Sequence, residues 1–575
     1  MASSEGQIRW WPGFLIVALQ WLVTFGGGLV APATPLHFFS MMGGPPVGLL
    51  LLLLWWTLAS GASGRDRWLV LVWFLVLPAA VLVLLHPSVP MAMMIYGIPI
   101  LSTVFVGVGT LSRRWPVASR RRLVAVAMVV AVLVWPLVRV DGVDGDMATE
   151  FAWRWQTTPE ERLVAAGTEF SRDVSNASAS QTAPSAAWWP EFRGDRTGVV
   201  PGVRLATDWQ TSPPEALWRR SVGPGWSSLT VVEGRLYTQE QRGEEEWVTA
   251  YDAATGEPIW GHSDTARFWE ALAGAGPRAT PTYDEGRLFT FGATGLLNAL
   301  DAETGAVLWR RDSAADTGAE TPMWGFASSP LVTEGLVVVH TGAGDGKAVV
   351  AYAADSGEPR WFAPAGPLSY SSLQRVRLHD VDQLLIATGD GVSSFVPQDG
   401  TVLWSHAWQV PGGARIVQPV VTPDQGVLLG TGFGMGVRRL AVDRRAEGVP
   451  GWQARELWTS RGMKPYYNDF VLHGEHLYGF DGRILACLDL ETGERRWKGG
   501  RYGNGQLILL ADQDLLLVLS DRGEVALVDA QPEGFNERAK VTAISGKTWN
   551  HPVLTDGVLY VRNGEEMAAL RLAME

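Results

Sequence analysis

Hydrophobic and polar positions divide this chain into two parts with different patterns. The first part holds five long apolar runs, at residues 11–30, 47–62, 68–85, 91–111 and 123–138, separated by short breaks that carry Pro, Gly or Arg. A helix needs about 20 apolar residues to cross ~30 Å of hydrocarbon, so some of these runs are near the lower limit. Five runs in succession nevertheless predict a membrane domain of about five transmembrane helices. A cleaved signal peptide would account only for the first run.

The second part alternates apolar and polar residues in short strands, and one phrase keeps returning. A strand is followed by Asp252, then by Thr255-Gly256, and the next strand ends in Trp260. Asp and Thr side chains bond the backbone of a turn and Gly takes a positive φ, so each copy predicts a β-hairpin. A period of 40–54 residues with several strands per unit predicts propeller blades, whose recurring Trp residues should pack between neighbours. Further copies end at Trp309, Trp361, Trp404 and Trp497.

A second marker counts the blades. A strand that begins Gly-x-Leu-Tyr, or a relative of it, occurs eight times, starting at Gly234, Gly286, Gly335, Asp382, Gly426, Gly474, Asp512 and Gly557. The segment Ala216-Leu-Trp218 precedes the first of these strands, and the last copy ends before any Trp strand. The N-terminal strand is therefore predicted to complete the C-terminal blade and to leave no free sheet edge. The pattern predicts an all-β, eight-bladed propeller.

Positive charge on alternate breaks predicts the orientation of the membrane domain. Arg9 precedes the first run, and Arg65 and Arg67 follow the second. The break after the fourth run carries five arginines, whereas the breaks after the first and third runs hold no Lys or Arg. By the positive-inside rule the amino terminus is cytoplasmic. Five crossings then place the propeller on the periplasmic side of the inner (cytoplasmic) membrane, with membrane lipid as a partner.

Composition removes two other classes of protein. The formal net charge is −12 and no basic stripe is visible, so nucleic acid is not expected as a partner. The single Cys487 excludes an intrachain disulfide and is expected to be inert, because it lies in a repeat strand.

The junction between the two parts has its own signals. Residues 151–155 hold three aromatic side chains and are expected to anchor at the membrane interface. Thr158-Pro159 predicts the cap and first turn of a short helix, and residues 171–187 are rich in Ser, Ala and Thr, which is typical of a linker. We therefore predict a transmembrane domain at 1–147, a juxtamembrane helix and linker at 148–187, and the propeller at 188–575.

The repeats resemble the pyrroloquinoline-quinone-like (PQQ-like) propeller family. The resemblance rests on the Asp-x-x-Thr-Gly-x-x-x-Trp hairpins and the Gly-x-Leu-Tyr strands, and covers about two-thirds of the chain. The family includes quinoprotein dehydrogenases and the non-enzymatic outer-membrane assembly lipoprotein. The segments Trp189-Pro-Glu-Phe-Arg-Gly194 and Met323-Trp-Gly-Phe resemble membrane-anchored bacterial members. The five-span layout resembles membrane-bound glucose dehydrogenase.

This resemblance admits pyrroloquinoline quinone with calcium as a cofactor but does not require it. Soluble quinoprotein alcohol dehydrogenases use two adjacent cysteines and a Glu/Asn/Asp calcium set. This chain has one cysteine, no Cys-x-x-Cys-His for a covalent haem, and no segment that aligns to the calcium set. Membrane glucose dehydrogenase also lacks the cysteine pair, so a dehydrogenase stays open as an alternative.

A ligand would be expected at the ring axis, because the innermost strands of all blades converge there. The residue six before the Gly marker is Ser228, Thr280, Ser329, Asn468 or His551 in five blades, with larger groups beside it. The ligand-binding candidates are Trp226, Arg278, Trp324, Tyr370, Asn468, Trp549 and His551. Arg278 and His551 should lie near the axis on one face, with an aromatic rim suited to an anionic or planar ligand. No catalytic or metal-binding residue is predicted.

Two interpretations remain open at this point. In one, small hydroxyl residues repeat because the inner strands crowd together, and the polar groups satisfy one another. In the other, they form a ligand site. The corresponding functions are a membrane-anchored scaffold that binds an envelope protein or a small ligand without turnover, or a quinoprotein alcohol or sugar dehydrogenase that passes electrons to membrane quinone.

Overall fold

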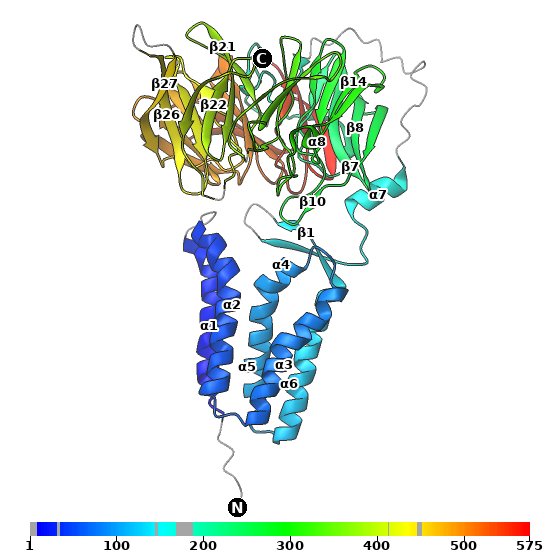
Figure 1. The fold of residues 1–575 in the computed structure, drawn as a ribbon, viewed down its shortest axis with the longest axis vertical. Coiled ribbons are helices and arrows are strands. Elements are labelled where there is room, and N and C mark those ends of the chain that lie inside the picture. The colour runs from blue at the N-terminus through cyan, green and yellow to red at the C-terminus, as the bar shows by residue number, and fades with distance from the viewer. Residues whose placement is uncertain are drawn as a thin grey trace, which may run out of the picture. The chain divides into compact units, whose positions relative to one another are not determined.

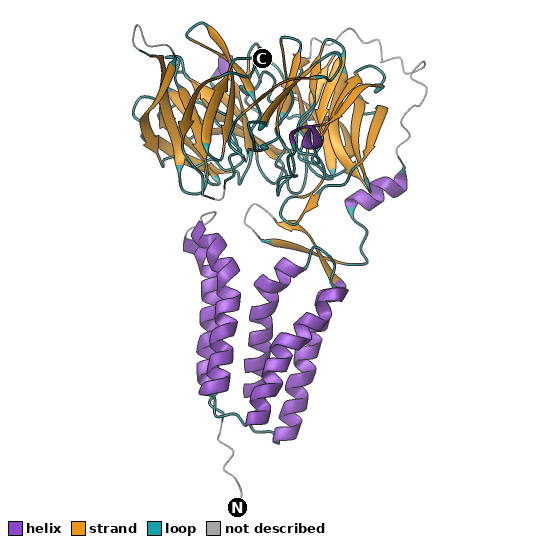
Figure 2. Ribbon diagram, in the orientation of Figure 1, coloured by secondary structure: helices purple, strands orange, loops and turns teal. Residues whose placement is uncertain are grey.

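The computed structural model describes residues 8–30, 35–143, 148–167, 188–367, 369–411, 413–445 and 451–575 (Figure 1). The chain forms two compact units, Met1–Thr157 with Ala271–Ala273, and Thr158–Glu270 with Gly274–Glu575. Helices dominate the first unit and strands the second (Figure 2). The predicted linker at 171–187 lies outside the described residues.

The helical unit contains five helical segments. They are α1 (Trp11–Val30), α2 (Pro35–Leu58), α3 (Gly64–Val81) with η1 (Leu82–Leu84), the run α4 (Pro90–Ala92), η2 (Met93–Gly97) and α5 (Ile98–Leu111), and α6 (Val117–Leu133) followed by η3 (Trp135–Leu137). Among the residues that the structure describes, four helices are long and apolar enough to cross a membrane, at Trp11–Val30, Leu36–Leu58, Gly64–Leu84 and Pro90–Leu111. The shorter α6 carries three consecutive arginines near its start.

Helix α2 begins twelve residues before the predicted run at 47–62. The Pro45-Pro46 pair was expected to lie in a break, but both prolines are inside the helix. The neighbouring helix α1 contacts this point, where the buried Gln20 side chain donates from Nε2 to the Pro45 carbonyl at 2.9 Å. Close packing between these helices supports the same arrangement, since a Cβ on Gly48 would collide with Gln20. Tertiary contacts of this kind let proline persist in membrane-type helices.

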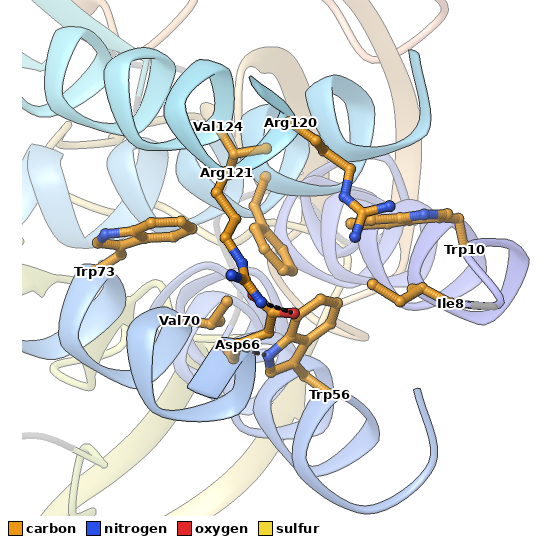
Figure 3. A pocket seen from close by; sticks show the side chains of 10 residues that line it. Ile8, Trp10, Trp56, Asp66, Val70, Trp73, Arg120, Arg121 and Val124 are labelled. Carbon is orange, nitrogen blue, oxygen red and sulfur yellow. Dashed lines mark hydrogen bonds and ion pairs between the residues drawn. The ribbon is translucent and has the colours of Figure 1, made fainter. Parts of the chain in front are cut away.

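An ion pair joins α3 and α6 at one end of the helical bundle (Figure 3). Ser63 caps α3, and the Asp66 carboxylate in the first turn of that helix pairs with Arg121 of α6. The pair lies beside Trp10 and Trp56, whose ring centroids are 5.7 Å apart. Sequence patterning predicted the arginines of this end but not their carboxylate partner.

The segment after α6 forms a hairpin, which the sequence pattern did not predict. Strand β1 (Val138–Val143) pairs with β2 (Thr149–Trp153) in antiparallel register. Trp153 and Trp155 stack with centroids 5.0 Å apart, and both side chains are exposed. The predicted short helix follows as α7 (Pro159–Ala166), with a complete capping box between Thr158 and Glu161.

The second unit is a propeller of eight sheets, as predicted. The first blade contains β3 (Trp188–Trp189), β6 (Thr230–Val232), β7 (Arg235–Arg242), β8 (Glu245–Asp252) and β9 (Pro258–Thr265). The second contains β12 (Thr282–Asp284), β13 (Arg287–Phe291), β14 (Leu296–Asp301) and β15 (Val307–Asp312), and the third contains β16 (Leu331–Thr333), β17 (Leu336–His340), β18 (Val349–Ala353) and β19 (Pro359–Ala363). The fourth contains β20 (Gln374–Leu378), β21 (Val381–Thr388), β22 (Gly391–Phe395) and β23 (Val402–Ala407).

The other four blades follow in chain order, and the seventh and eighth each take one strand from the N-terminal segment. The fifth blade contains β24 (Val420–Val421), β25 (Val427–Thr431), β26 (Gly436–Arg444) and β27 (Trp452–Ser460), and the sixth contains β28 (Val471–His473), β29 (His476–Asp481), β30 (Ile484–Asp489) and β31 (Arg495–Arg501). The seventh contains β4 (Val199–Val200), β32 (Gln506–Leu510), β33 (Leu515–Leu519), β34 (Glu524–Asp529) and β35 (Glu537–Thr542). The eighth contains β36 (Val553–Thr555), β37 (Val558–Arg562), β38 (Glu566–Arg571) and β5 (Glu215–Ser221). Between blades lie the hairpin β10 (Trp269–Glu270) and β11 (Gly274–Ala275) and the helix α8 (Ser313–Thr317), and η5 (Ala511–Gln513) lies in the seventh blade.

The ring closes as predicted. Strand β5 pairs with β38 in antiparallel register and places Trp218 opposite Ala569. The eighth blade thus takes its outer strand from the beginning of the propeller, and the two ends of the ring are joined by main-chain hydrogen bonds.

The recurring Trp residues pack between blades, as predicted, and the structure explains the whole repeat phrase. The Trp260 indole donates from Nε1 to the Ala302 carbonyl of the next blade at 3.1 Å. Its ring covers Gly305, the turn glycine of that blade, where a Cβ would lie 2.5 Å from the indole. Four other turn glycines are covered in the same way by the Trp of the preceding blade: Gly256, Gly357, Gly400 and Gly493. Glycine is needed there both for its positive φ and for the close approach of the ring.

Candidate functional site at the ring axis

A continuous belt of hydrogen bonds joins all eight blades near the axis. From the first blade to the sixth, the backbone N–H of a residue just before each inner strand donates to a side chain of the next blade, as from Ser228 to Thr280 Oγ1 at 3.0 Å and from Gln418 to Asp469 Oδ1 at 2.6 Å. Three more such bonds join the second, third, fourth and fifth blades. The Gln506 amide bridges the carbonyls of Tyr467 and Trp549, both at 3.1 Å. The belt comprises Ser228, Thr280, Ser329, Ser372, Gln418, Asp469, Gln506 and His551.

The belt favours the interpretation in which small polar residues satisfy one another. The Ser228 hydroxyl completes it by donating to the His551 carbonyl of the eighth blade at 2.7 Å. In the sixth blade the belt member is Asp469, one residue after the candidate Asn468. The reason is the turn: Gly474 is the first of two turn residues there, whereas Gly234 is the second, so counting back from Gly gives a position one too early. Asn468 instead accepts from the Tyr466 N–H at 2.9 Å.

Four of the candidates contribute to an aromatic rim next to the belt. Trp226 and Trp549 lie with ring centroids 4.8 Å apart, and Trp324 and Tyr370 lie 5.1 Å apart. The first pair continues through three further rings, Tyr467, Tyr466 and Phe433, each in contact with the one before. All seven side chains are half-buried. We call these seven residues the aromatic rim. Sequence reasoning named Trp226, Trp324, Tyr370 and Trp549 for it and missed Phe433.

Arg278 is engaged within the connection between the first two blades. Its guanidinium pairs with Glu270 at 3.4 Å, donates to the carbonyls of Gly274 and Gly276, and stacks on Phe268 at 4.6 Å. Burial lowers the pKa of Arg278 to about 10, and the charge of Glu270 opposes that shift. The charge expected to attract an anionic ligand is therefore met by a carboxylate of the chain itself.

A segment at the start of the propeller, for which the sequence predicted no function, lies at the ring axis. Residues 188–200, which we call the axial strap, lie on the inner side of the inner strands. Strand β3 pairs with β6 of the first blade, and β4 pairs in parallel with β32 of the seventh. The carbonyl of Pro190 accepts from Tyr283 of the second blade at 2.7 Å. The strap therefore crosses the space that the eight inner strands enclose.

Two arginines of the axial strap extend this contact to three more blades, and Phe192 extends it to a fourth. Arg196 is buried and donates to the carbonyl of Leu373 at 2.8 Å and to those of Ser329 and Pro330, and it pairs with Glu191. Arg193 is 1 % exposed, lies 3.5 Å from Asp469 and donates to the Phe470 carbonyl at 3.5 Å. Adjacent Phe192 packs edge-on against the His551 ring, with centroids 4.9 Å apart.

The candidate His551 is thus part of the strap contact. Its Nε2 lies 3.5 Å from the Asp469 carboxylate, and the residue is buried. Burial, and secondly the charge of Arg193, hold the pKa of His551 well below its usual value, so the ring is neutral at pH 7. Burial likewise raises the pKa of Asp469 and lowers that of Arg193, while their mutual attraction opposes both shifts.

The charged groups of the axis do not form a metal site. Within the residues that the structure describes, no group of three or more His, Cys, Asp or Glu side chains could hold a metal ion. Cys487 is buried and free, and burial raises its pKa to about 12, in keeping with an inert thiol.

Comparisons with known proteins identify relatives of the propeller. A family model described as outer membrane protein assembly factor BamB matches residues 244–499. BamB of Shewanella oneidensis is 27% identical over 364 residues, which are 61% of this chain and 86% of the relative. A quinohemoprotein alcohol dehydrogenase of Pseudomonas putida is 33% identical over 137 residues, which are 23% of this chain and 18% of that enzyme. The crystal structure of BamB from Moraxella catarrhalis aligns with a TM-score of 0.46 at 15% identity, covering 62% of this chain and all of that one.

Proposed function

We propose that this protein is a membrane-anchored scaffold whose propeller binds an envelope partner without turnover. Its β-domain belongs to the PQQ-like propeller family. The observation that carries this proposal is the state of the axis. Its polar side chains bond to the backbone of neighbouring blades around the ring, and its arginines pair with groups of the chain itself. The relatives named BamB, an outer membrane protein assembly factor, support an envelope role.

The aromatic rim is the surface that we assign to partner binding. Half-buried Trp and Tyr side chains from several blades combine apolar area with polar edges, a composition typical of binding hot spots. Lys547 lies over the rings of two of its members, Trp226 and Trp549, at 5.5 and 4.9 Å. Of the predicted candidates, Trp226, Trp324, Tyr370 and Trp549 thus stay in the proposed site. Arg278, Asn468 and His551 have partners within the ring.

Replacing Trp226 and Trp549 together by Ala should reduce capture of the partner at least about tenfold, because hot-spot aromatics contribute about 2 kcal/mol or more each. The measurement is crosslinking in intact cells, followed by purification of the full-length protein and quantification of each captured envelope protein. Trp269→Ala is the matched control, since Trp269 is 40% exposed and lies outside the rim. Equal capture by the rim variant and the control would contradict this assignment.

Anchoring in the membrane is supported by the surface of the helical unit. Apolar side chains such as Leu29 and Val83 are more than four-fifths exposed, as lipid-facing residues would be. Exposed Trp11 and Trp68 lie near the starts of α1 and α3, and exposed Trp155 follows the β1–β2 hairpin at the other end of the bundle (Figure 1). Aromatic residues at both ends of a bundle of apolar helices are typical of the two membrane–water interfaces.

A reporter enzyme that is active only in the cytoplasm should be active when fused after Gly64 or Ser119 and silent when fused after Asp146. The arginines on alternate breaks give this expectation through the positive-inside rule. It implies an inner-membrane protein with a cytoplasmic amino terminus and a periplasmic propeller. Reporter activity after Asp146 would mean an even number of crossings and a cytoplasmic propeller.

The second candidate function is a quinoprotein dehydrogenase that passes electrons to membrane quinone. Its support is the 33% identical segment shared with a quinohemoprotein alcohol dehydrogenase. The axial residues do not fit its cofactor. Pyrroloquinoline quinone is a planar tricarboxylate that needs cations and a metal ion, whereas Arg193, Arg196 and Arg278 are each paired within the chain.

A further inference from the structure

We infer that the axial strap is a built-in ligand of the ring: it fills the axis with two arginine side chains, holds the inner strands together and leaves this propeller unable to bind pyrroloquinoline quinone. The inference does not depend on which partner the aromatic rim binds. It rests on the contacts, the backbone conformation and the burial of residues 188–200.

The first support is the receptor that the ring forms for Arg196. Three carbonyls of the third and fourth blades accept from this guanidinium, and the Glu191 carboxylate of the strap completes the set. In return, the Arg196 carbonyl accepts from the Gln374 side chain at 3.3 Å. A guanidinium is a planar fork of five donors, so a matched set of acceptors holds it in one orientation. Nothing in this set would attract a carboxylate of an added ligand.

The second support is the insertion of Phe192 and Arg193 between the sixth and eighth blades. Arg193 reaches Asp469 and Phe470 of the sixth blade, while Phe192 packs on His551 of the eighth. The neutral His551 ring and the buried Arg193–Asp469 pair leave no uncompensated positive charge from these groups for a tricarboxylate.

The third support is the conformation of the strap. Arg193 and Arg196 have φ values of 59° and 70°, and Gly194 and Gly198 have 81° and 74°. Positive φ is unfavourable at residues other than glycine, so the packing around the strap must impose it at both arginines. This coil turns both guanidinium groups toward the ring, and Gly198 must lack a Cβ because Arg193 occupies that space. Backbone strain of this kind is retained where the surrounding contacts over-determine the fold.

The test compares full-length protein in detergent with the variants Arg193→Ala, Arg196→Ala and Arg196→Lys. Arg204→Ala is the matched control, since Arg204 is also paired with a carboxylate but its side chain is 54% exposed. We expect Arg196→Ala to lower Tm by about 4 °C or more, because it leaves buried acceptors and a carboxylate without their cation, whereas the control shifts by about 1 °C or less. Guanidinium ion at millimolar concentration should recover part of the loss in Arg196→Ala and none in the control. An unchanged Tm in Arg193→Ala and Arg196→Ala would overturn the inference.

Two measurements on the unmodified protein keep the test independent of how the variants fold. Hydrogen exchange should show the strap peptides as protected as the inner strands β6 and β32, with which they share hydrogen bonds. Titration with pyrroloquinoline quinone and Ca²⁺ should give no saturable absorbance change and no rise in Tm. Exchange of the strap at the rate of an open loop, or stoichiometric uptake of the quinone, would each overturn the inference. Uptake would also favour the dehydrogenase, whereas loss of partner capture in the rim variant concerns only the scaffold.

Discussion

Replacing β5, Glu215–Ser221, by a Gly-Ser segment of equal length is expected to abolish the folded propeller. The substitution removes the outer strand of the eighth blade and leaves β38 as an edge strand without its β5 hydrogen-bond partner. It also removes Trp218, which donates from Nε1 to the Ala253 carbonyl of the first blade at 3.0 Å and covers Gly256. Loss of a packed Trp alone costs about 3–5 kcal/mol, a large share of the stability of an ordinary domain.

The measurement is size-exclusion chromatography and thermal unfolding of the full-length protein in detergent. The control is the same replacement within residues 171–187, which should leave Tm unchanged. Trp218→Ala is a milder variant that keeps the strand and should lower Tm by about 3 °C or more. A monomeric strand-replacement protein with unchanged melting would refute the shared eighth blade as a source of stability.

Gly305→Ala is expected to destabilise the propeller about three times as much as Gly286→Ala. Both glycines lie in turns of the second blade with positive φ, 73° and 80°, so both substitutions cost about 1 kcal/mol of backbone strain. They differ in their surroundings, because a Cβ at Gly305 would lie 2.5 Å from the Trp260 indole, whereas a Cβ at Gly286 meets no atom within 4 Å. Displacing the indole adds about 1–3 kcal/mol of overpacking and weakens its bond to Ala302.

Thermal unfolding of the two variants, measured side by side, separates these contributions. Backbone strain is common to both, so the difference in Tm reports only the contact with Trp260. Trp260→Phe combined with Gly305→Ala is a further check, because the smaller ring should recover part of the loss. Equal shifts for Gly305→Ala and Gly286→Ala would mean that the interlock between blades contributes nothing to stability.

The features that the sequence made predictable are those repeated along it. The Asp-x-x-Thr-Gly-x-x-x-Trp motif recurs because each turn glycine packs under the Trp of the preceding blade. The same packing requirement therefore appears in the sequence repeatedly, blade after blade. The early strand around Trp218 was predictable for the same reason, since the repeat count left one copy at each end of the chain. The capping box at Thr158 and Glu161 is local and needed no knowledge of the fold.

The features that escaped prediction each depend on one long-range contact. The carbonyls of Pro330 and Leu373 that receive Arg196 lie more than 130 residues away in the chain, and backbone acceptors have no sequence signature. The pairing of Arg278 with Glu270 depends on a two-strand hairpin too short to show a pattern. The inclusion of Pro45 in a helix escaped prediction because its contact with Gln20 comes from another helix.

The order in which β5 and its partner are synthesised has a consequence for how the ring forms. Strand β5 ends at Ser221 and β38 begins at Glu566, so 344 residues are made between them, from position 222 to position 565. Until β38 emerges, β5 has no native partner, and its Trp-bearing edge is open to pairing with other chains. Blades one to seven can assemble in sequence, but closure must wait for the last blade, which gives this contact a long loop to close and makes it a slow step. We therefore expect the newly made propeller to pass through an open, aggregation-prone arc, and its yield in cells to depend on chaperones that shield one early strand.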